Sequence, residues 1–334
     1  GLKEHSVRIL VKSGIGAAGA FAAQIVNGPA RARLAPMLGR FHAWWEGEDW
    51  DPEAYPAPAE AAADEPAAAG LTVESSQSTP WSPARRQVVE GLWGAGFSAP
   101  GDDAQVLALV APLGLDATRS AIEIGAGLGG AARAIARETG AHVTGLEASP
   151  DLVEAAMALS AKAGLAKRAP VTLFAPPHLD LADGALDAIV SRAALFALAA
   201  KDELFADCHR VLKPAGQLLV TDYLLARDGD SSTALDDWIA NELPQPRPWS
   251  VARTLACLEE LGFELRASED VGAETRKLAL AGWDRFVRML SPGAVAPDVA
   301  RAIVGELELW RRRLELLAAG ALCCRRIHAV KRQA

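Results

Sequence analysis

The sequence predicts an α/β fold, with a Rossmann-like sheet of seven, mostly parallel strands. Two observations lead to this prediction: short apolar runs alternate with helical patterns over most of the chain, and the first run ends in closely spaced glycines. Strand–helix–strand units of this kind build parallel sheets with right-handed crossovers. The expected strands are 120–125, 142–147, 170–174, 186–191, 216–223, 262–269 and 322–330.

The first expected strand leads into a glycine-rich turn, residues 125–130. Glycines let the backbone turn tightly and approach a ligand where a Cβ atom would collide. A helix is expected from Gly130, with Gly140 as its stop. The next strand ends on Glu147, where a carboxylate can accept hydrogen bonds from ribose hydroxyls. We therefore expect a nucleotide-containing cofactor at the carboxyl ends of the strands.

The glycine spacing alone leaves the cofactor open. Gly125, Gly127 and Gly130 also satisfy the dinucleotide fingerprint G-x-G-x-x-G, so a dinucleotide-dependent oxidoreductase is an alternative. Glu123 is an acid inside an otherwise apolar strand. Its burial is costly unless it meets a positive or donor group, and an α-amino group would satisfy it.

The order of motifs from Glu123 to Tyr223 resembles that of class I S-adenosylmethionine-dependent methyltransferases. Within that class the chain is most similar to small-molecule methyltransferases of the phosphoethanolamine and sarcosine N-methyltransferase type. The resemblance covers residues 88–224 well and 250–330 loosely. The passages that carry it are Leu92–Gly101, Ile124–Gly130, Ser191-Arg192 with Leu212–Tyr223, and Leu261–Phe263 with Glu269-Asp270.

This resemblance implies S-adenosyl-L-methionine as the cofactor and assigns roles by position. Arg192 can hold a carboxylate or phosphate, or pair with Asp222. Tyr223 and Arg192 are the catalytic candidates. The expected cofactor residues are Glu123, Gly125, Gly127, Gly129, Glu147, Ala175 and Ser191, and the expected substrate contacts are Trp93, Phe97, Arg192, Asp222, Trp238 and Trp249.

The chain departs from this family where the family binds adenine and moves protons. An aspartate usually follows the third strand, whereas this chain has Ala175, with Asp180 near enough in sequence to substitute. Ala193 and Ala197 replace an acid and a histidine that serve the chemistry of phosphoethanolamine methyltransferases. Without a base, we expect methyl transfer to a small-molecule nitrogen or sulfur nucleophile rather than to an alcohol. The alternative is an inactive methyltransferase-fold protein that senses the cofactor or acts as a scaffold.

Composition divides the chain into an N-terminal helical arm (1–50), an Ala/Pro-rich linker (51–80) and a methyltransferase domain (81–334) with a helical lid within 232–318. We expect the arm to dock on the domain, on a protein partner or on a membrane surface, and a homodimer contact is a further hypothesis. The net charge of −8 argues against a nucleic-acid partner. Four cysteines without disulfide or metal spacing predict a cytoplasmic setting and no metal.

Overall fold

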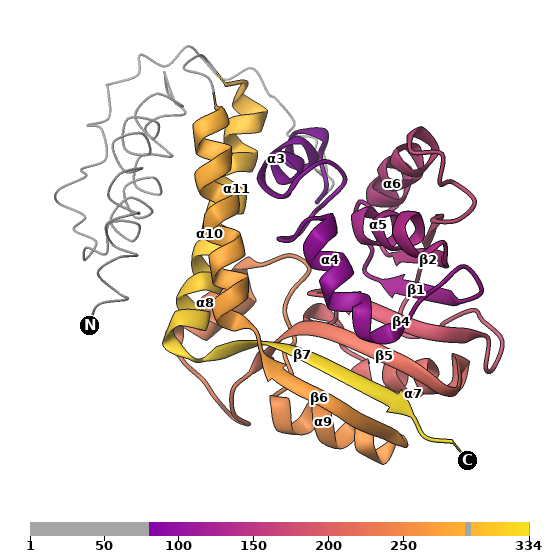
Figure 1. The fold of residues 1–334 in the computed structure, drawn as a ribbon. Helices are drawn as coiled ribbons and strands as arrows, with labels where there is room; N and C mark the ends of the chain where they lie inside the picture. The colour runs from indigo at the N-terminus through magenta and orange to yellow at the C-terminus, as the bar shows by residue number, and fades with distance from the viewer. Residues whose placement is uncertain (1–79, 291–294, 334) are drawn as a thin grey trace, which may run out of the picture. The chain divides into compact units, whose positions relative to one another are not determined.

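The computed structural model describes residues 80–290 and 295–333 (Figure 1). The predicted N-terminal arm and residues 51–79 of the predicted linker lie outside these residues. The chain divides into two compact units, a larger one of residues 89–282 with 312–334, and a smaller one whose described part is 80–88 with 283–290 and 295–311. Within the described ranges, every helix is too short or too polar to cross a membrane.

The larger unit is built on a seven-stranded sheet with the order β3-β2-β1-β4-β5-β7-β6. The pairs among β1 to β5 are parallel, and β7 runs antiparallel between β5 and β6. The predicted seven-stranded, mostly parallel fold is therefore confirmed. The strands are β1 Ser120–Ile124, β2 His142–Glu147, β3 Val171–Leu173, β4 Leu186–Arg192, β5 Leu212–Leu225, β6 Phe263–Asp270 and β7 Leu322–Lys331.

Strand β5 begins earlier than the sequence predicts. Lys213-Pro-Ala-Gly216 reads as a turn, but the structure includes it in the strand beside an irregular register with β4. Ala215 takes a left-handed backbone there, with φ of 61°. An irregularity of this kind accommodates Pro214 and Gly216, which regular sheet pairing disfavours.

One face of the sheet is covered by helices that follow the first two strands (Figure 1). These are α5 Gly130–Thr139 and α6 Pro150–Lys162, with α4 Asp103–Val110 packed beside α5. Helix α5 ends as predicted at Gly140, whose φ is 76°. Asp102 and Gln105 form a reciprocal capping box that fixes the start of α4.

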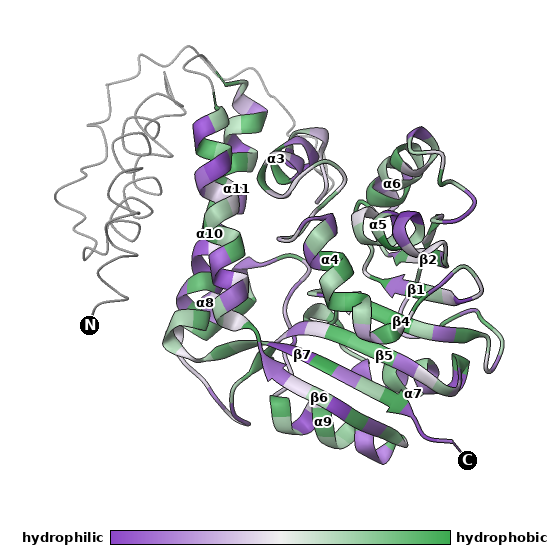
Figure 2. Ribbon diagram, viewed as in Figure 1, coloured by the Kyte–Doolittle hydropathy of each residue, from purple (hydrophilic) through white to green (hydrophobic). Residues whose placement is uncertain are grey.

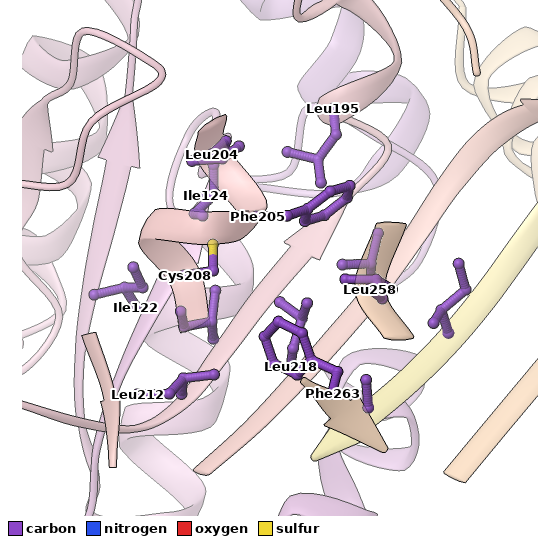
Figure 3. Close-up of a cluster of buried hydrophobic side chains, with 14 of the residues drawn as sticks. Ile122, Ile124, Leu195, Leu204, Phe205, Cys208, Leu212, Leu218, Leu258 and Phe263 are labelled. Carbon is purple, nitrogen blue, oxygen red and sulfur yellow. The ribbon is translucent and has the colours of Figure 1, made fainter. Parts of the chain in front are cut away.

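The opposite face packs on α7 Lys201–Val211 and α9 Val251–Glu260. Figure 3 shows this core, in which Ile122 and Leu218 of the sheet meet Phe205 of α7 and Leu258 of α9. Both helices carry hydrophobic and hydrophilic residues, as expected for helices with one buried face (Figure 2). The predicted lid within 232–318 includes α9, but the apolar face of this helix is buried against the sheet, so α9 is not part of a lid.

A second apolar cluster lies on the other face of β5 and β7. It joins α8 (Thr233–Asn241) and the end of α11 (Pro297–Ala319) to the sheet, through Phe196, Tyr223, Leu235, Trp238, Leu316, Leu322 and Cys324. The remaining helices are α3 Pro83–Trp93 and α10 Gly272–Met289, and short 3-10 turns occupy Ala111–Leu113 and Leu195–Ala197. In the smaller unit, Arg85 Nε lies 2.6 Å from Glu306 Oε1.

Candidate functional site

The glycine-rich turn lies between β1 and α5 and is closely packed. Gly125 and Gly127 have φ of 75° and 55°, a region that favours glycine. A Cβ atom on Gly127 would lie 2.1 Å from Ser98 Oγ, and one on Gly125 would lie 2.1 Å from Ala194 Cβ. The turn therefore contacts both the segment before β1 and the loop that follows β4.

Glu147 ends β2 beside this turn. Its Oε2 accepts a hydrogen bond from Gly127 N at 2.8 Å, and its Oε1 accepts one from Ser149 N at 2.9 Å. These bonds fix the orientation of the carboxylate. Each oxygen keeps further acceptor capacity, so the carboxylate suits a ligand with neighbouring hydroxyls.

Glu123 is buried in β1 under the first turn of α5. Its Oε2 accepts a hydrogen bond from Ala132 N at 3.0 Å. Burial raises the pKa of Glu123 to about 7, while the charges of Arg192 and Arg133 oppose the shift. The backbone N–H of Ala132 thus gives Glu123 a hydrogen-bond donor, the kind of partner that the sequence suggested a cofactor amino group would provide.

Two other predicted cofactor residues have different surroundings. The buried Ser191 hydroxyl donates to Ile124 O at 3.0 Å and links β4 to β1. Ala175 is exposed just after β3, and Asp180 is exposed as well. Ser191 therefore has a structural hydrogen bond, and Ala175 offers a ligand only its backbone and a methyl group.

A cavity of about 190 Å³ lies where β4 and β5 end and β7 begins. Helix α4 and the start of α10 contribute its apolar residues. Its lining is Ala99, Pro100, Gly101, Gln105, Val106, Ala108, Leu109, Arg192, Ala193, Thr221, Tyr223, Val271, Glu274, Thr275, Leu278, Cys324 and Arg326. The loop that supplies Ala193 also contacts Gly125 through Ala194, so cavity and glycine turn share a wall.

Arg192 reaches this cavity from the end of β4. Its Nη2 donates to Pro100 O at 3.0 Å, which ties the segment before α4 to the carboxyl end of β4. Burial lowers the pKa of Arg192 and the charge of Glu123 opposes this, but a guanidinium stays charged at neutral pH. The structure does not show the predicted alternative, an ion pair with Asp222.

Asp222 instead interacts with Lys201. Burial raises the pKa of Asp222 to about 7, and the charge of Lys201 counteracts the shift. Lys201 Nζ donates to Leu198 O and Arg247 O, each at 2.6 Å, next to the loop after β4. Asp222 does not line the cavity. This residue was predicted to contact the substrate, but it lies beneath the loop after β4 and can support that loop instead.

Tyr223 does line the cavity. The Phe196 ring packs edge-on at 5.6 Å, and the Arg313 guanidinium lies 4.9 Å from the Tyr223 ring centroid. Burial raises the pKa of Tyr223 well above its usual value. The residue is therefore a neutral phenol at physiological pH, suited to hydrogen bonding rather than to proton abstraction.

The predicted aromatic substrate contacts are packed in the protein interior. The Trp238 indole stacks on Phe196 at 5.8 Å and donates to Glu242 Oε2 at 2.6 Å. A Cβ on Gly282 would lie 2.4 Å from Trp93 Cζ3, and one on Gly130 would lie 2.9 Å from the Phe97 ring. Trp249 packs edge-on to Phe205 at 6.3 Å. None of the four tryptophan and phenylalanine candidates lines the described cavity, so we leave them out of the acceptor site.

Sequence reasoning missed several residues that line the cavity, among them Thr221, Glu274, Cys324 and Arg326. Cys324 is buried, which raises its pKa to about 12. Cys324 pairs with Tyr223 across β7 and β5, and Arg326 pairs with Thr221. Only the register of β5 and β7 shows that Cys324 and Arg326 lie beside Tyr223 and Thr221, and the sequence alone does not reveal this register.

Comparison with known proteins shows that the core of this chain is similar to methyltransferases. Residues 122–220 match a family model described as a methyltransferase domain. A sterol 24-C-methyltransferase of Yarrowia lipolytica is 25% identical over 187 residues, covering 54% of this chain and 49% of that protein. The chain spans about half the length of the curated relatives it matches first.

Solved structures share the fold. Haemonchus contortus phosphoethanolamine N-methyltransferase 2, in complex with phosphomonomethylethanolamine and S-adenosylhomocysteine, matches with a TM-score of 0.64 and 22% identity, over 74% of this chain and 57% of that one. A Galdieria sulphuraria protein proposed to be a sarcosine dimethylglycine methyltransferase matches with a TM-score of 0.62 and 20% identity, over 75% and 98% of the chains. Residues 122–220 therefore match a methyltransferase domain, within a core that has the class I methyltransferase fold.

Proposed function

We propose that this protein transfers a methyl group from S-adenosylmethionine to a small molecule bound in the cavity at the ends of β4, β5 and β7. The observation that carries the proposal is the shared wall between this cavity and the glycine turn, formed by Arg192, Ala193 and Ala194. A methyl donor on the turn and an acceptor in the cavity would then be neighbours. The methyltransferase family match over residues 122–220 supports the same assignment.

The residues around the turn fit the cofactor. Gly125, Gly127 and Gly129 give a backbone without side chains on the approach, and Glu147 is fixed with acceptor capacity to spare for ribose hydroxyls. Glu123 would lie near the methionine end, where its carboxylate can accept from an amino group in addition to Ala132 N. Bound there, the cofactor supplies an activated methyl group with a neutral sulfide as leaving group.

The chain's own part in the reaction is to align the acceptor and exclude water. Tyr223 can orient the acceptor with its neutral hydroxyl. The lining contains one carboxylate, Glu274, which is exposed. Because Ala193 and Ala197 supply no base after β4, we propose an acceptor atom that needs little deprotonation. Nitrogen and sulfur nucleophiles meet this condition, and we propose one of them as the acceptor atom. The name of the Yarrowia relative, in contrast, specifies methyl transfer to carbon.

The alternative, an inactive cofactor sensor or scaffold, rests on the same alanines. A cavity beside the glycine turn favours catalysis over this alternative, because an inactive relative has no need of acceptor space. We further propose a cytoplasmic setting, which the free thiols of Cys208, Cys257, Cys323 and Cys324 support. The proposed membrane, protein or homodimer contact of the N-terminal arm falls on residues outside the described ranges.

Calorimetry and methyl-transfer assays test the proposal. The full chain is titrated with S-adenosylmethionine, S-adenosylhomocysteine and NAD, and then incubated with methyl-labelled S-adenosylmethionine and panels of amines, thiols and alkenes. We expect binding of both S-adenosyl compounds, no binding of NAD, and label transfer within at least one panel. Preferential NAD binding would refute the cofactor assignment, and cofactor binding without any transfer would favour the sensor or scaffold.

A further inference from the structure

Three side chains form a row across the sheet on the floor of the cavity. Arg192 of β4 is the register partner of Thr221 of β5, and Thr221 is in turn the register partner of Arg326 of β7. Side chains of register partners lie on the same face of a sheet, and all three line the cavity. Neighbouring strands are about 4.8 Å apart, so the Cα atoms of the two arginines are separated by roughly 10 Å, with the threonine between them.

The threonine hydroxyl is unpaired among the described residues. Thr221 Oγ1 is buried and makes no hydrogen bond to any residue that the structure describes. A buried hydroxyl left without a hydrogen-bond partner is unfavourable, because it has lost its bonds to water. A ligand atom that accepts a hydrogen bond from this hydroxyl would remove that cost.

The flanking arginines have donors to spare. A guanidinium carries five N–H groups, and within the described residues Arg192 uses one of these groups, for Pro100 O. Arg326 is held by an ion pair with Glu269, its register partner on β6. The lining has one carboxylate, Glu274, which is exposed on α10, so the lining sets two guanidinium groups against a single carboxylate.

The lining also has an apolar part. It consists of Val106 and Leu109 of α4, Val271 just before α10, and Leu278 within α10. A volume of about 190 Å³ is below the roughly 300–1,000 Å³ of pockets that hold drug-sized ligands. The cavity therefore suits a compact, amphipathic molecule with one charged end.

We infer that the methyl acceptor is a small amphipathic anion, whose carboxylate or phosphate lies between Arg192 and Arg326 over the Thr221 hydroxyl, with its apolar body against α4 and α10. The inference names the substrate class of the proposed methyltransferase and rests on that function for the word acceptor. The anion site itself exists or fails independently of turnover. Paired guanidinium groups bind both oxyanions well, because each offers two parallel N–H donors.

The test uses three probes that share a phenyl ring: benzoate, phenyl phosphate and the neutral benzamide. Each is titrated calorimetrically into the full chain, with and without saturating S-adenosylhomocysteine. We expect at least one anion to bind ten times more tightly than benzamide, a discrimination that charge-assisted hydrogen bonds supply. Which of benzoate and phenyl phosphate binds more tightly distinguishes a carboxylate acceptor from a phosphate acceptor.

Variants assign the binding to the row. Arg192→Gln and Arg326→Gln should each weaken anion binding at least tenfold, and the isosteric Thr221→Val about fivefold. Arg325→Gln is the matched control, because Arg325 is adjacent in β7 but bonds to Ser268 and is absent from the lining. Thermal unfolding of each variant verifies folding, and Thr221→Val, which changes neither charge nor size, decides the matter if an arginine variant unfolds.

Equal binding of benzamide and the anions would overturn the inference, as would unchanged anion binding in Thr221→Val and Arg326→Gln. An equal loss in Arg325→Gln would also overturn it, because that result indicates general surface charge. Failure of the proposed function looks different: the chain would not bind S-adenosylhomocysteine, while the anion probes could still bind and respond to the variants.

Discussion

Asp222 and Tyr223 are neighbours in β5, yet their side chains serve opposite faces of the sheet. Tyr223 lines the cavity, whereas Asp222 is buried on the other face, near Lys201 of α7. One strand thus supplies both a side chain that can touch the acceptor and a charge beneath the loop that forms the cavity rim. The alternation of strand side chains accounts for this division.

Glu147 offers a direct test of the cofactor site. Glu147→Ala removes a charged acceptor and the cap of Gly127 N, and should weaken S-adenosylmethionine binding by about 2–4 kcal/mol. Calorimetry measures the change. Glu154→Ala, an exposed position on α6, is the control and should bind like the wild type. Unchanged affinity in Glu147→Ala would contradict the assignment.

Gly127 tests the close packing of the turn. Gly127→Ala places a Cβ 2.1 Å from Ser98 Oγ and should lower cofactor affinity at least tenfold. Gly164→Ala provides the comparison, because Gly164 has a similar φ of 70° with no atom within 4 Å of its Cβ position. It should cost about 1 kcal/mol of stability and leave binding unchanged. Equal binding losses in both variants would show that backbone strain, rather than packing, causes the effect.

Tyr223 tests the chemistry. Because burial keeps its phenol neutral, Tyr223→Phe removes an orienting hydrogen bond and should reduce kcat only about tenfold. The pH profile of turnover should follow the ionisation of the acceptor in both proteins. A loss of about 10²–10⁴-fold, the range of a lost general base, would show that Tyr223 moves a proton.

Glu123 makes stability depend on pH. Its pKa is raised from 4.5 to about 7 in the folded protein, so the stability it contributes is fully present below about pH 4.5 and is lost as the pH rises through about 7. Glu123→Gln does not titrate. Between about pH 5 and pH 8, its free energy of unfolding should therefore rise relative to wild type by about 2 kcal/mol.

Urea unfolding at the two pH values measures this difference. Asp187→Asn is the control of opposite sign: the folded pKa of Asp187 is lowered to about 2, so its contribution is lost only in acid and should be constant over the same range. Parallel curves for Glu123→Gln and wild type would mean that folding does not raise the pKa of Glu123, and would contradict the prediction.

The order of strands and helices could be predicted because each parallel unit leaves a local signal in the sequence, such as the apolar run ending at Gly125 or the strand ending at Glu147. Packing between distant segments leaves no such signal. Trp238 was predicted to contact a ligand, but it packs against Phe196. The predicted lid within 232–318 includes α9, but Leu258 of this helix lies in the core.

The cavity illustrates the same limit. Arg192 could be proposed because it ends a predicted strand, whereas Arg326 follows Thr221 by more than a hundred residues and becomes its neighbour only through the register of β7. The spacing of the glycines can be read within one segment of the sequence, whereas the cavity forms only when distant strands pair in the sheet. Pairing between β5 and β7 had no turn or motif to mark it.

The position of β7 has a consequence for synthesis. β7 lies between β5 and β6 in the sheet but is the last of these strands to leave the ribosome. While residues 322–331 are still being translated, β5 presents an open edge, and such edges favour pairing with other chains. The nascent protein must therefore keep Tyr223 and its strand from aggregating until its final partner emerges.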